Sequence, residues 1–335
     1  MLALAIDQRP QPPEPAGLAR PGCDDLGFRF TAMASTCEVR IAGMRQRKAR
    51  PLAELAIAEV RRIETKYSRY RPDSIVSRIN ASAGSGGAIR VDAETAGLLD
   101  FAASLFAASG GLFDLTSGCL RRAWDFRAGR LPAPGEVEAL LPLVGWSKVH
   151  WNGEAIELPQ PGMEIDFGGF GKEYAADRAA TLLQTHDVRH GLVNLGGDIR
   201  LVGPRPGNAP WLLGIQDPRR ADRLLAELPV RTGALATSGD YERYFEHDGT
   251  RYCHVLDPRS GWPVTGWRSI SVVAPACLAA GALTTVAMLK GTDALNFLES
   301  QNVAYLAVDA AGRRHEGQPG NASTPTDSTD SPDRW

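Results

Sequence analysis

The chain contains few cysteines, and their spacing does not fit the usual cysteine-built sites. Five of its 335 residues are cysteines, and no two of them form a CxxC pair. This scatter argues against a disulfide framework and against a structural zinc site. The cysteines are Cys23, Cys37, Cys119, Cys253 and Cys277.

Long apolar runs and an excess of charge of one sign are also missing. No apolar run approaches the roughly 20 residues that a helix needs to cross a bilayer. The 37 lysine and arginine residues nearly balance the 39 aspartate and glutamate residues, so nothing indicates a nucleic-acid-binding surface. Residues 1–15 lack the basic and apolar regions of a signal peptide. We therefore expect a cytoplasmic protein without a membrane anchor or a nucleic-acid partner.

Composition divides the chain into three parts. Residues 1–26 are rich in proline and polar residues, and residues 313–335 consist largely of Gly, Pro, Ser, Thr and Asp. We expect the first segment to be a flexible leader and the last a disordered tail. Between them, strand and helix patterns alternate without a regular βαβ period. This favours a single α+β domain over residues 27–312, with a mixed or antiparallel sheet and packed helices.

Several helices can be placed from their apolar periodicity and end signals. One is expected to begin after Pro51, because residues 52, 56, 60 and 63 are apolar at helical spacing. A second is expected to be capped by Asp92 and to end at Gly110. An alanine-rich helix is expected over 279–289, and strands over 37–41 and 269–274.

The most informative stretch is 164–198. Gly168, Gly169 and Gly171 precede Lys172, and a helical pattern follows. A glycine loop that opens a helix leaves backbone N–H groups free at the positive end of the helix dipole, which suits a phosphate. The alternative is a helix start with three turn glycines. The spacing fits neither a P-loop nor a dinucleotide-binding fingerprint. A second glycine turn, Asn-Leu-Gly-Gly-Asp at 194–198, follows the helix.

Polar turns elsewhere supply further candidates. They lie at 67–74, 111–118, 237–241 and 254–261. The first can equally be a solvated connector. His254 alone among six histidines stands in a polar, turn-rich neighbourhood. A lone histidine is more often structural than catalytic, so the residues alone leave its role open.

Taken together, these segments resemble the ApbE-like family of FAD:protein FMN transferases. The specific combination is Asn-Leu-Gly-Gly-Asp at 194–198, Thr-Ser-Gly-Asp-Tyr at 237–241 and His-x-x-Asp-Pro-x-Ser-Gly at 254–261. The other matching segments, in family order, are 32–36, 68–80, 111–126, 164–178, 211–218 and 269–291. The resemblance implies one α+β domain of the T-fold type.

The resemblance also implies an activity. Such proteins hold FAD with a divalent metal, usually Mg²⁺, and cleave its pyrophosphate. They attach FMN to a threonine of a target flavoprotein and release AMP. By position, flavin contacts are expected from Met33, Tyr70, Leu112, Phe113, Asp114, Lys172, Arg178 and Leu256.

Phosphoryl transfer depends on positioning and on neutralising phosphate charge, which basic side chains and a metal would provide. The resemblance makes Lys172, Asp177 and His254 the candidate catalytic residues. His254 is a candidate base or orienter for the acceptor hydroxyl. Thr285 and the carbonyl of Ala175 are the metal ligands that the family pattern implies.

Two positions depart from the family pattern. Its Asp-Ala-Leu-Ser/Thr-Thr run, whose aspartate binds the metal, begins here with Gly281. Its Lys-Gly-Tyr-Ala run has Glu173 in place of the glycine. One acid is lost and another gained in segments expected to converge, so Glu173 is a candidate metal ligand that replaces the missing aspartate. It can also merely complement the helix dipole or pair with Lys172.

Two other functions remain open from the sequence. One is an FAD-binding protein without transferase activity, because Gly281 cannot bind a metal through a side chain. The other is an Mg²⁺-dependent FAD pyrophosphatase that gives free FMN and AMP.

Overall fold

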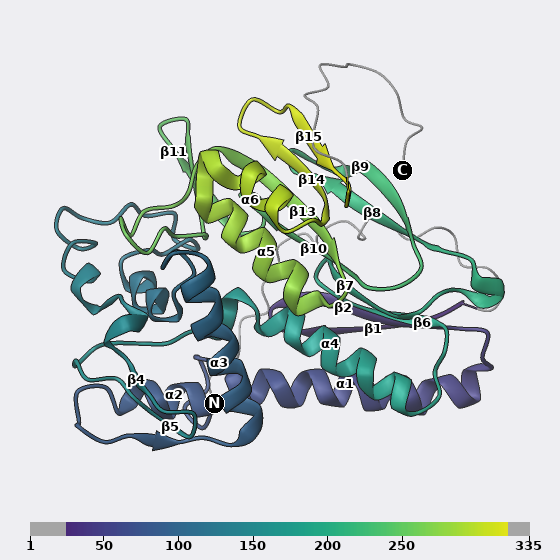
Figure 1. Ribbon diagram of the computed structural model, residues 1–335, viewed down its shortest axis with the longest axis horizontal. Coiled ribbons are helices and arrows are strands. Elements are labelled where there is room, and N and C mark those ends of the chain that lie inside the picture. Colours follow the sequence, from purple (N-terminus) through teal and green to yellow (C-terminus); the bar gives the residue numbers. More distant parts are fainter. Residues whose placement is uncertain (1–24, 321–335) are drawn as a thin grey trace, which may run out of the picture.

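The computed structural model describes residues 25–320 (Figure 1). The predicted leader up to residue 24 and the predicted tail from residue 321 lie outside the described residues. The main feature is an eight-stranded sheet in the order β1-β2-β6-β7-β10-β13-β14-β15. Its strands are β1 (Asp25–Ala32), β2 (Ser35–Ala42), β6 (Gly191–Leu195), β7 (Asp198–Gly203), β10 (Ala234–Gly239), β13 (Trp267–Ala274), β14 (Ala304–Asp309) and β15 (Arg314–Gly317).

Each pair of neighbouring strands in this sheet is antiparallel. This confirms the predicted α+β class and, of the two predicted sheet types, the antiparallel one. The helices near the sheet are α1 (Gln46–Tyr67), α4 (Gly171–Thr185), α5 (Cys277–Lys290) and α6 (Ala294–Ser300).

The alternation of side chains along the strands determines which face each layer covers. In β10, Ala234 and Ala236 pack with residues of the helices, whereas Leu235 packs with the β8–β9 hairpin. Successive residues of a strand point to opposite faces, so α1, α4 and α5 cover one face and the hairpin covers the other. The hairpin consists of β8 (Trp211–Asp217) and β9 (Arg220–Val230), with Trp211 fully buried.

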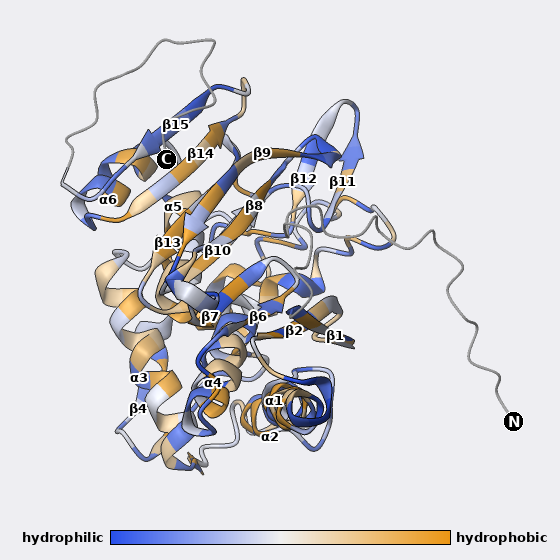
Figure 2. Cartoon of the chain, turned by 90° about the vertical axis from the view of Figure 1, so that its right-hand side faces the viewer, coloured by the Kyte–Doolittle hydropathy of each residue, from blue (hydrophilic) through white to orange (hydrophobic). Residues whose placement is uncertain are grey.

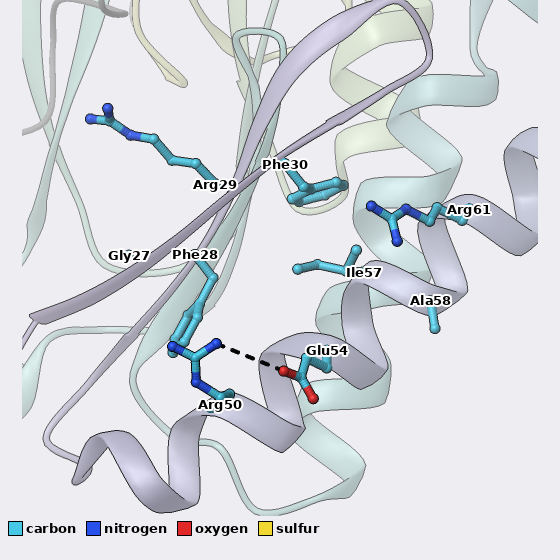
Figure 3. Close-up of a pocket in the computed structure, with 9 residues that line it drawn as sticks. All are labelled: Gly27, Phe28, Arg29, Phe30, Arg50, Glu54, Ile57, Ala58 and Arg61. Atoms are coloured by element: carbon cyan, nitrogen blue, oxygen red, sulfur yellow. Dashed lines mark ion pairs between the residues drawn. The ribbon is translucent and has the colours of Figure 1, made fainter.

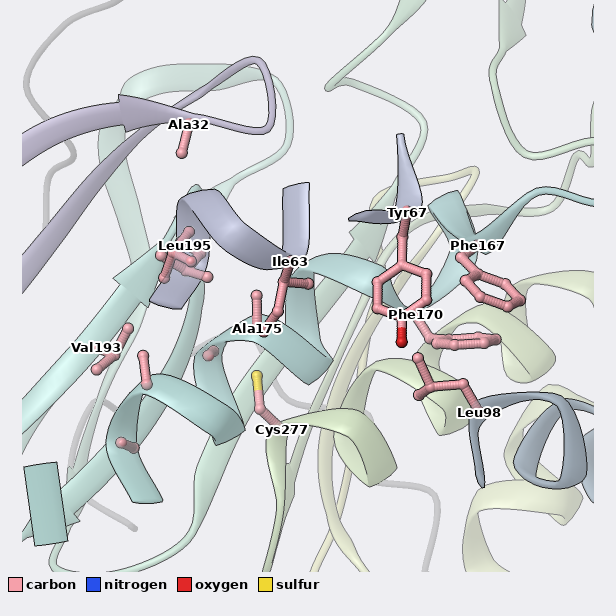
Figure 4. Close-up of a cluster of buried hydrophobic side chains, with 14 of the residues drawn as sticks. Ala32, Ile63, Tyr67, Leu98, Phe167, Phe170, Ala175, Val193, Leu195 and Cys277 are labelled. Atoms are coloured by element: carbon pink, nitrogen blue, oxygen red, sulfur yellow. The ribbon is translucent and has the colours of Figure 1, made fainter. Parts of the chain in front are cut away.

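The helix-side core joins α1, α4, α5 and the sheet. Ile63 of α1, Ala175 of α4 and Cys277 of α5 lie within this cluster, next to Val193 of β6 (Figure 4). Farther along, Phe170 contacts Phe113 and other aromatic rings, with ring centroids 6.0 Å apart for the Phe113 pair. The small alanines of α4 allow the two neighbouring helices to approach it closely.

The predicted start of the first helix was wrong. Helix α1 begins at Gln46, and Pro51 lies inside it rather than before it. Proline lacks only one intrahelical donor there, while the helix buries Ala49, Ala53 and Val60 completely. This apolar stripe extends the helix toward its N-terminus beyond the proline.

The predicted start of the tail was also wrong. Residues 314–317 form β15, which pairs with β14 and is the edge strand of the sheet. Its composition is hydrophilic, as Figure 2 shows beside the more apolar β14. An edge strand needs an apolar face on one side at most, so composition alone did not distinguish it from a tail.

A smaller layer beside α4 and α5 carries α3 (Ala93–Ala108), which Asp92 caps as predicted by accepting a hydrogen bond from the Thr95 amide. Its remaining elements are α2 (Ile75–Ala81), β3 (Ile89–Arg90), β4 (His150–Trp151) and β5 (Ala155–Glu157). A separate hairpin consists of β11 (Tyr244–His247) and β12 (Thr250–Cys253). Short 3-10 helices are η1 (Leu115–Arg122), η2 (Leu141–Leu143), η3 (Trp146–Lys148), η4 (Phe167–Gly169), η5 (Pro206–Asn208) and η6 (Gly291–Asp293). Over residues 25–320, no helix combines the length and apolar character needed to cross a membrane.

Candidate active site

The start of α4 has no side-chain cap. Asp166 caps the preceding η4 by accepting a hydrogen bond from the Gly168 amide, and α4 then begins at Gly171 after Phe170. The side chain of Phe170 makes no capping hydrogen bond. The start of α4 therefore lacks an N-cap side chain, which leaves room for a phosphate there.

Lys172 is held in place by a buried aspartate. Its Nζ lies 2.9 Å from Oδ2 of Asp198, which is only 2% exposed. The second oxygen of Asp198 accepts a hydrogen bond from the Thr237 amide at 3.2 Å. Burial alone would lower the pKa of Lys172, but the nearby carboxylates, Asp198 foremost, raise it well above its usual value. The ammonium group therefore stays charged at neutral pH.

The turns between β1 and β2 and between β6 and β7 meet beside this lysine. A β-carbon on Gly196 would lie 2.8 Å from Cβ of Ser35 and 3.7 Å from Nζ of Lys172. Gly196 also has a φ of 62°, which favours glycine. The first turn carries Met33, whose amide donates a 2.6 Å hydrogen bond to Glu64. Two of the predicted flavin contacts, Met33 and Lys172, thus lie on adjoining elements.

Glu173 is buried without full compensation. It is 8% exposed, and its Oε2 has no hydrogen-bond partner. Burial first and the charge of Asp198 second raise its pKa well above the usual value. A buried polar atom without a partner costs free energy, so this carboxyl group calls for a structural explanation.

Helix α5 brings hydroxyl groups to the same region. A β-carbon on Gly281 would lie 2.5 Å from Cγ of Glu173, so the glutamate side chain lies directly against the glycine. One turn later, the hydroxyl of Thr285 lies 3.3 Å from that of Ser238 at the end of β10. Ser238 also bonds to Thr284 at 2.9 Å. The structure therefore places Glu173 against Gly281, while a metal-binding role for Glu173 and Thr285 stays a prediction.

His254 follows β12. Its amide donates a hydrogen bond to the carbonyl of Arg243, and its ring atom Nδ1 is buried without a partner. Burial, together with the positive charges of Arg121, Arg243 and Lys172, lowers the pKa of the imidazole to about 4. The ring is therefore neutral at pH 7, which a general base requires.

The low pKa of His254 should make the free energy of unfolding depend on pH. The folded pKa of about 4 lies below the ordinary value of 6.5, so the unfolded chain takes up the proton first and stability falls as pH drops through this window. Between pH 7.5 and pH 5, His254 should contribute a loss of about 2 kcal/mol. Urea unfolding of the wild type and of His254→Gln at both pH values measures this contribution. An equal pH dependence of the two proteins would contradict it.

Asp177 links α4 to α5. Its carboxylate accepts hydrogen bonds from the amides of Cys277 and Leu278, at 2.9 and 2.8 Å, and lies 3.2 Å from Arg200. These amides open α5, whose own N-cap residue Ala276 offers no side-chain acceptor. Asp177 therefore caps α5 from a neighbouring helix, and its predicted catalytic role stays a prediction.

The capping role predicts a stability effect. Asp177→Ala should lower the free energy of unfolding by about 2 kcal/mol, since it removes an N-cap acceptor and leaves two amides unpaired. Asp177→Asn keeps an acceptor oxygen and should cost less. Urea unfolding measures both variants. Wild-type stability combined with a selective loss of catalysis would instead support a direct catalytic role.

Other predicted flavin contacts have partners of their own. Oδ1 of Asp114 accepts hydrogen bonds from the amide and hydroxyl of Thr116, and Oδ2 accepts one from the Trp146 amide. Both oxygens of Asp114 therefore serve the fold. Leu112 and Phe113, which precede it, are buried.

Three more predicted contacts have other surroundings in the fold. Tyr70 is 78% exposed, with the guanidinium of Arg69 over its ring. Arg178 forms an ion pair with Glu59 of α1 at 3.3 Å. Leu256 pairs with Pro263 in an isolated bridge and packs beside the Trp124 cluster. Their contact with a flavin stays a prediction.

Ala175 lies in the interior of α4 and is fully buried. Helix carbonyls point toward the C-terminal end and accept the amide four residues later. The carbonyl of Ala175 thus points away from Lys172 and Glu173 at the helix start. This direction disfavours it as a metal ligand in the arrangement seen here.

A surface hollow of about 660 Å³ lies elsewhere, between β1 and α1 (Figure 3). Phe28 and Phe30 of β1 and Ile57 of α1 line it, together with an Arg50–Glu54 ion pair. It contains none of the residues predicted to bind flavin or metal. The candidate site is therefore defined by its polar groups and not by this hollow.

Sequence reasoning did not single out Asp198 and Ser238 as site residues. Both lie within motifs that it quoted, Asn-Leu-Gly-Gly-Asp and Thr-Ser-Gly-Asp-Tyr, and their polar side chains were the available signal. Within residues 25–320, no group of three or more His, Cys, Asp or Glu side chains is arranged to hold a metal ion. A cation here would need hydroxyl, carbonyl or substrate oxygens as well, which Mg²⁺ accepts.

Comparisons with known proteins found relatives that match most of the chain. A profile of the ApbE family matches residues 33–307. A curated FAD:protein FMN transferase of Treponema pallidum is 32% identical over 284 residues, which cover 77% of each chain. One of Vibrio cholerae is 31% identical and covers 69% of this chain and 71% of its own.

Solved structures are similar over most of the chain. The ApbE protein of Thermotoga maritima superposes with a TM-score of 0.81 at 31% identity, over 87% of this chain and 96% of that one. The flavin transferase ApbE of Vibrio cholerae gives a TM-score of 0.78 at 25% identity, over 89% and 97% of the two chains.

Proposed function

The chain belongs to the ApbE family, and we propose that it is an FAD:protein FMN transferase that attaches FMN to a threonine of a target flavoprotein and releases AMP. The observation that carries this proposal is the pairing of Lys172 with buried Asp198 beside the uncapped start of α4. A fixed positive charge next to free N–H groups suits a pyrophosphate. It also neutralises charge as the phosphoryl group moves.

In this reaction the threonine hydroxyl attacks the phosphorus of the FMN half of FAD. The new P–O bond forms as the bond to the bridging oxygen breaks, and AMP leaves with that oxygen. The neutral imidazole of His254 accepts the hydroxyl proton, which makes the oxygen a better nucleophile. Lys172 balances negative charge on the pyrophosphate. Asp177 positions α5 and, with it, Thr285.

The donor groups also suit Mg²⁺, which prefers hard oxygen ligands. The hydroxyl of Thr285 and the buried carboxylate of Glu173 are such oxygens, and Oε2 of Glu173 has no partner in the fold. The Ala175 carbonyl, which the family pattern adds, points away from them along α4. A bound Mg²⁺ would polarise the phosphate oxygens and stabilise the leaving AMP. Lys172 and the α4 start bind the remaining oxygens.

A direct assay tests the transfer. We expect purified protein with FAD, Mg²⁺ and a domain carrying an acceptor threonine to give a flavin-fluorescent acceptor band on a denaturing gel. An acceptor domain with that threonine changed to alanine is the matched control. Free FMN and AMP without a fluorescent band would instead indicate a pyrophosphatase, and intact bound FAD would indicate a binding protein.

We further propose a cytoplasmic location, which fractionation of cells would test.

The role of His254 gives a second prediction. His254→Ala should lower the transfer rate by about 10²-fold or more, the usual effect of a positioned acid–base group, while FAD affinity changes only several-fold. Flavin fluorescence titration measures the affinity and the gel assay measures the rate. Equal losses of rate and affinity would mean that His254 acts as a structural group near the flavin. An unchanged rate would exclude both roles.

A further inference from the structure

The backbone conformation at residue 281 does not explain why this residue is a glycine. It lies inside α5, and its φ is not among the positive values that favour glycine. Glycine in a helix interior costs about 1 kcal/mol relative to alanine. The residue therefore reduces helix stability locally, and a reason for it must come from its surroundings.

The surroundings are occupied by Glu173. A β-carbon on Gly281 would lie 2.5 Å from Cγ, 2.7 Å from Oε1 and 2.8 Å from Cδ of that glutamate. Nonbonded carbon atoms pack at about 3.5–4 Å, so neither an aspartate nor an alanine fits at 281 while Glu173 keeps its position. The two positions exclude each other, and the acid that α5 lacks is supplied from α4 into the same space.

One oxygen of the Glu173 carboxyl group, Oε2, has no hydrogen-bond donor. Oε2 is buried and unpartnered, although Lys172 is its neighbour in sequence. The Lys172 ammonium is instead 2.9 Å from Asp198. A buried carboxyl oxygen needs a hydrogen bond or a cation in place of the water that it has lost. The described residues offer Oε2 no hydrogen bond.

Helix α5 carries a hydroxyl group on the same face as Gly281. Thr285 follows Gly281 by four residues, so both lie on one face of α5. Its hydroxyl is 3.3 Å from that of Ser238. A carboxylate on one helix and a hydroxyl on another are hard oxygen ligands. Mg²⁺ and Mn²⁺ accept such ligands when substrate phosphates complete the coordination.

We infer that Glu173 is the acidic ligand of the divalent cation in this enzyme, and that Gly281 is a glycine because the Glu173 side chain reaches the cation through its space. This inference rests on the proposed function in assuming an FAD-bound cation. It assigns the acid to α4, whereas the family pattern places it on α5.

Binding of Mn²⁺ tests the inference without any turnover. In the presence of FAD and without an acceptor, electron paramagnetic resonance measures free Mn²⁺ during titration. We expect Glu173→Gln, which keeps the shape but not the charge, to weaken Mn²⁺ binding at least tenfold. Glu54→Gln, an exposed glutamate of α1, is the matched control and should bind like the wild type. Circular dichroism verifies that both variants are folded.

A residue exchange makes the test specific for position. Glu173→Ala should lose Mn²⁺ affinity, and the double variant Glu173→Ala with Gly281→Asp should recover it to within about threefold of the wild type. Glu173→Ala with Gly281→Ala fills the same space without an acid and should not recover it. Gly281→Asp alone should lower the melting temperature, because the aspartate meets the Glu173 side chain.

The results separate this inference from the proposed function. Wild-type Mn²⁺ affinity in Glu173→Gln would overturn the inference, even if FMN transfer is confirmed. Failure of the exchange variant to regain more affinity than its alanine counterpart would overturn the equivalence of positions 173 and 281. If the metal results hold but no acceptor is modified, the transferase function is wrong and the metal ligand stands.

Discussion

The close contact between α4 and α5 is the constraint on which the candidate site depends. Two carboxylates of α4, one turn apart, make this contact. Asp177 accepts hydrogen bonds from the first amides of α5, and Glu173 lies against Gly281 one turn farther along that helix. The cap fixes the direction of α5, and the glycine permits the short distance. Together they hold α5, and with it Thr285, against α4.

The sheet holds the other half of the site. Strand alternation sends Ala234 and Ala236 of β10 toward the helices, and β10 ends at Ser238 and Gly239, next to α5. Asp198 opens β7 on the neighbouring strand and bonds to the Thr237 amide, so adjacent strands present an acid and a hydroxyl at one end. The rigid antiparallel ladder therefore sets the spacing between Lys172, which Asp198 binds, and the α5 hydroxyls.

Sequence alone predicted the features with local causes. The α3 cap at Asp92 and its end at glycine follow from side-chain chemistry within a few residues, and the motifs around Lys172 and His254 identified the family. The start of α1 was missed because burial of Ala49 outweighs the cost of Pro51, which no local rule weighs. The strand β15 was missed because its stability comes from its partner β14. Pairing with a distant strand leaves little trace in composition.

Within the site, sequence predicted which residues converge but not how each is satisfied. The sequence does not distinguish the three acids of this region, whereas the structure gives each of them different partners. Asp198 has a lysine and an amide, and Asp177 has two amides and an arginine. The charges of both carboxylates are therefore already compensated within the fold, so either one would bind a cation less strongly. Glu173 keeps a buried carboxyl oxygen without a partner, and the imidazole of His254 keeps a buried ring nitrogen without one. A buried polar atom costs about 1–3 kcal/mol when it is left unpaired, and a bound molecule can offset that cost. Within the candidate site, Glu173 and His254 are therefore the two groups that we propose the substrate and its cation complete.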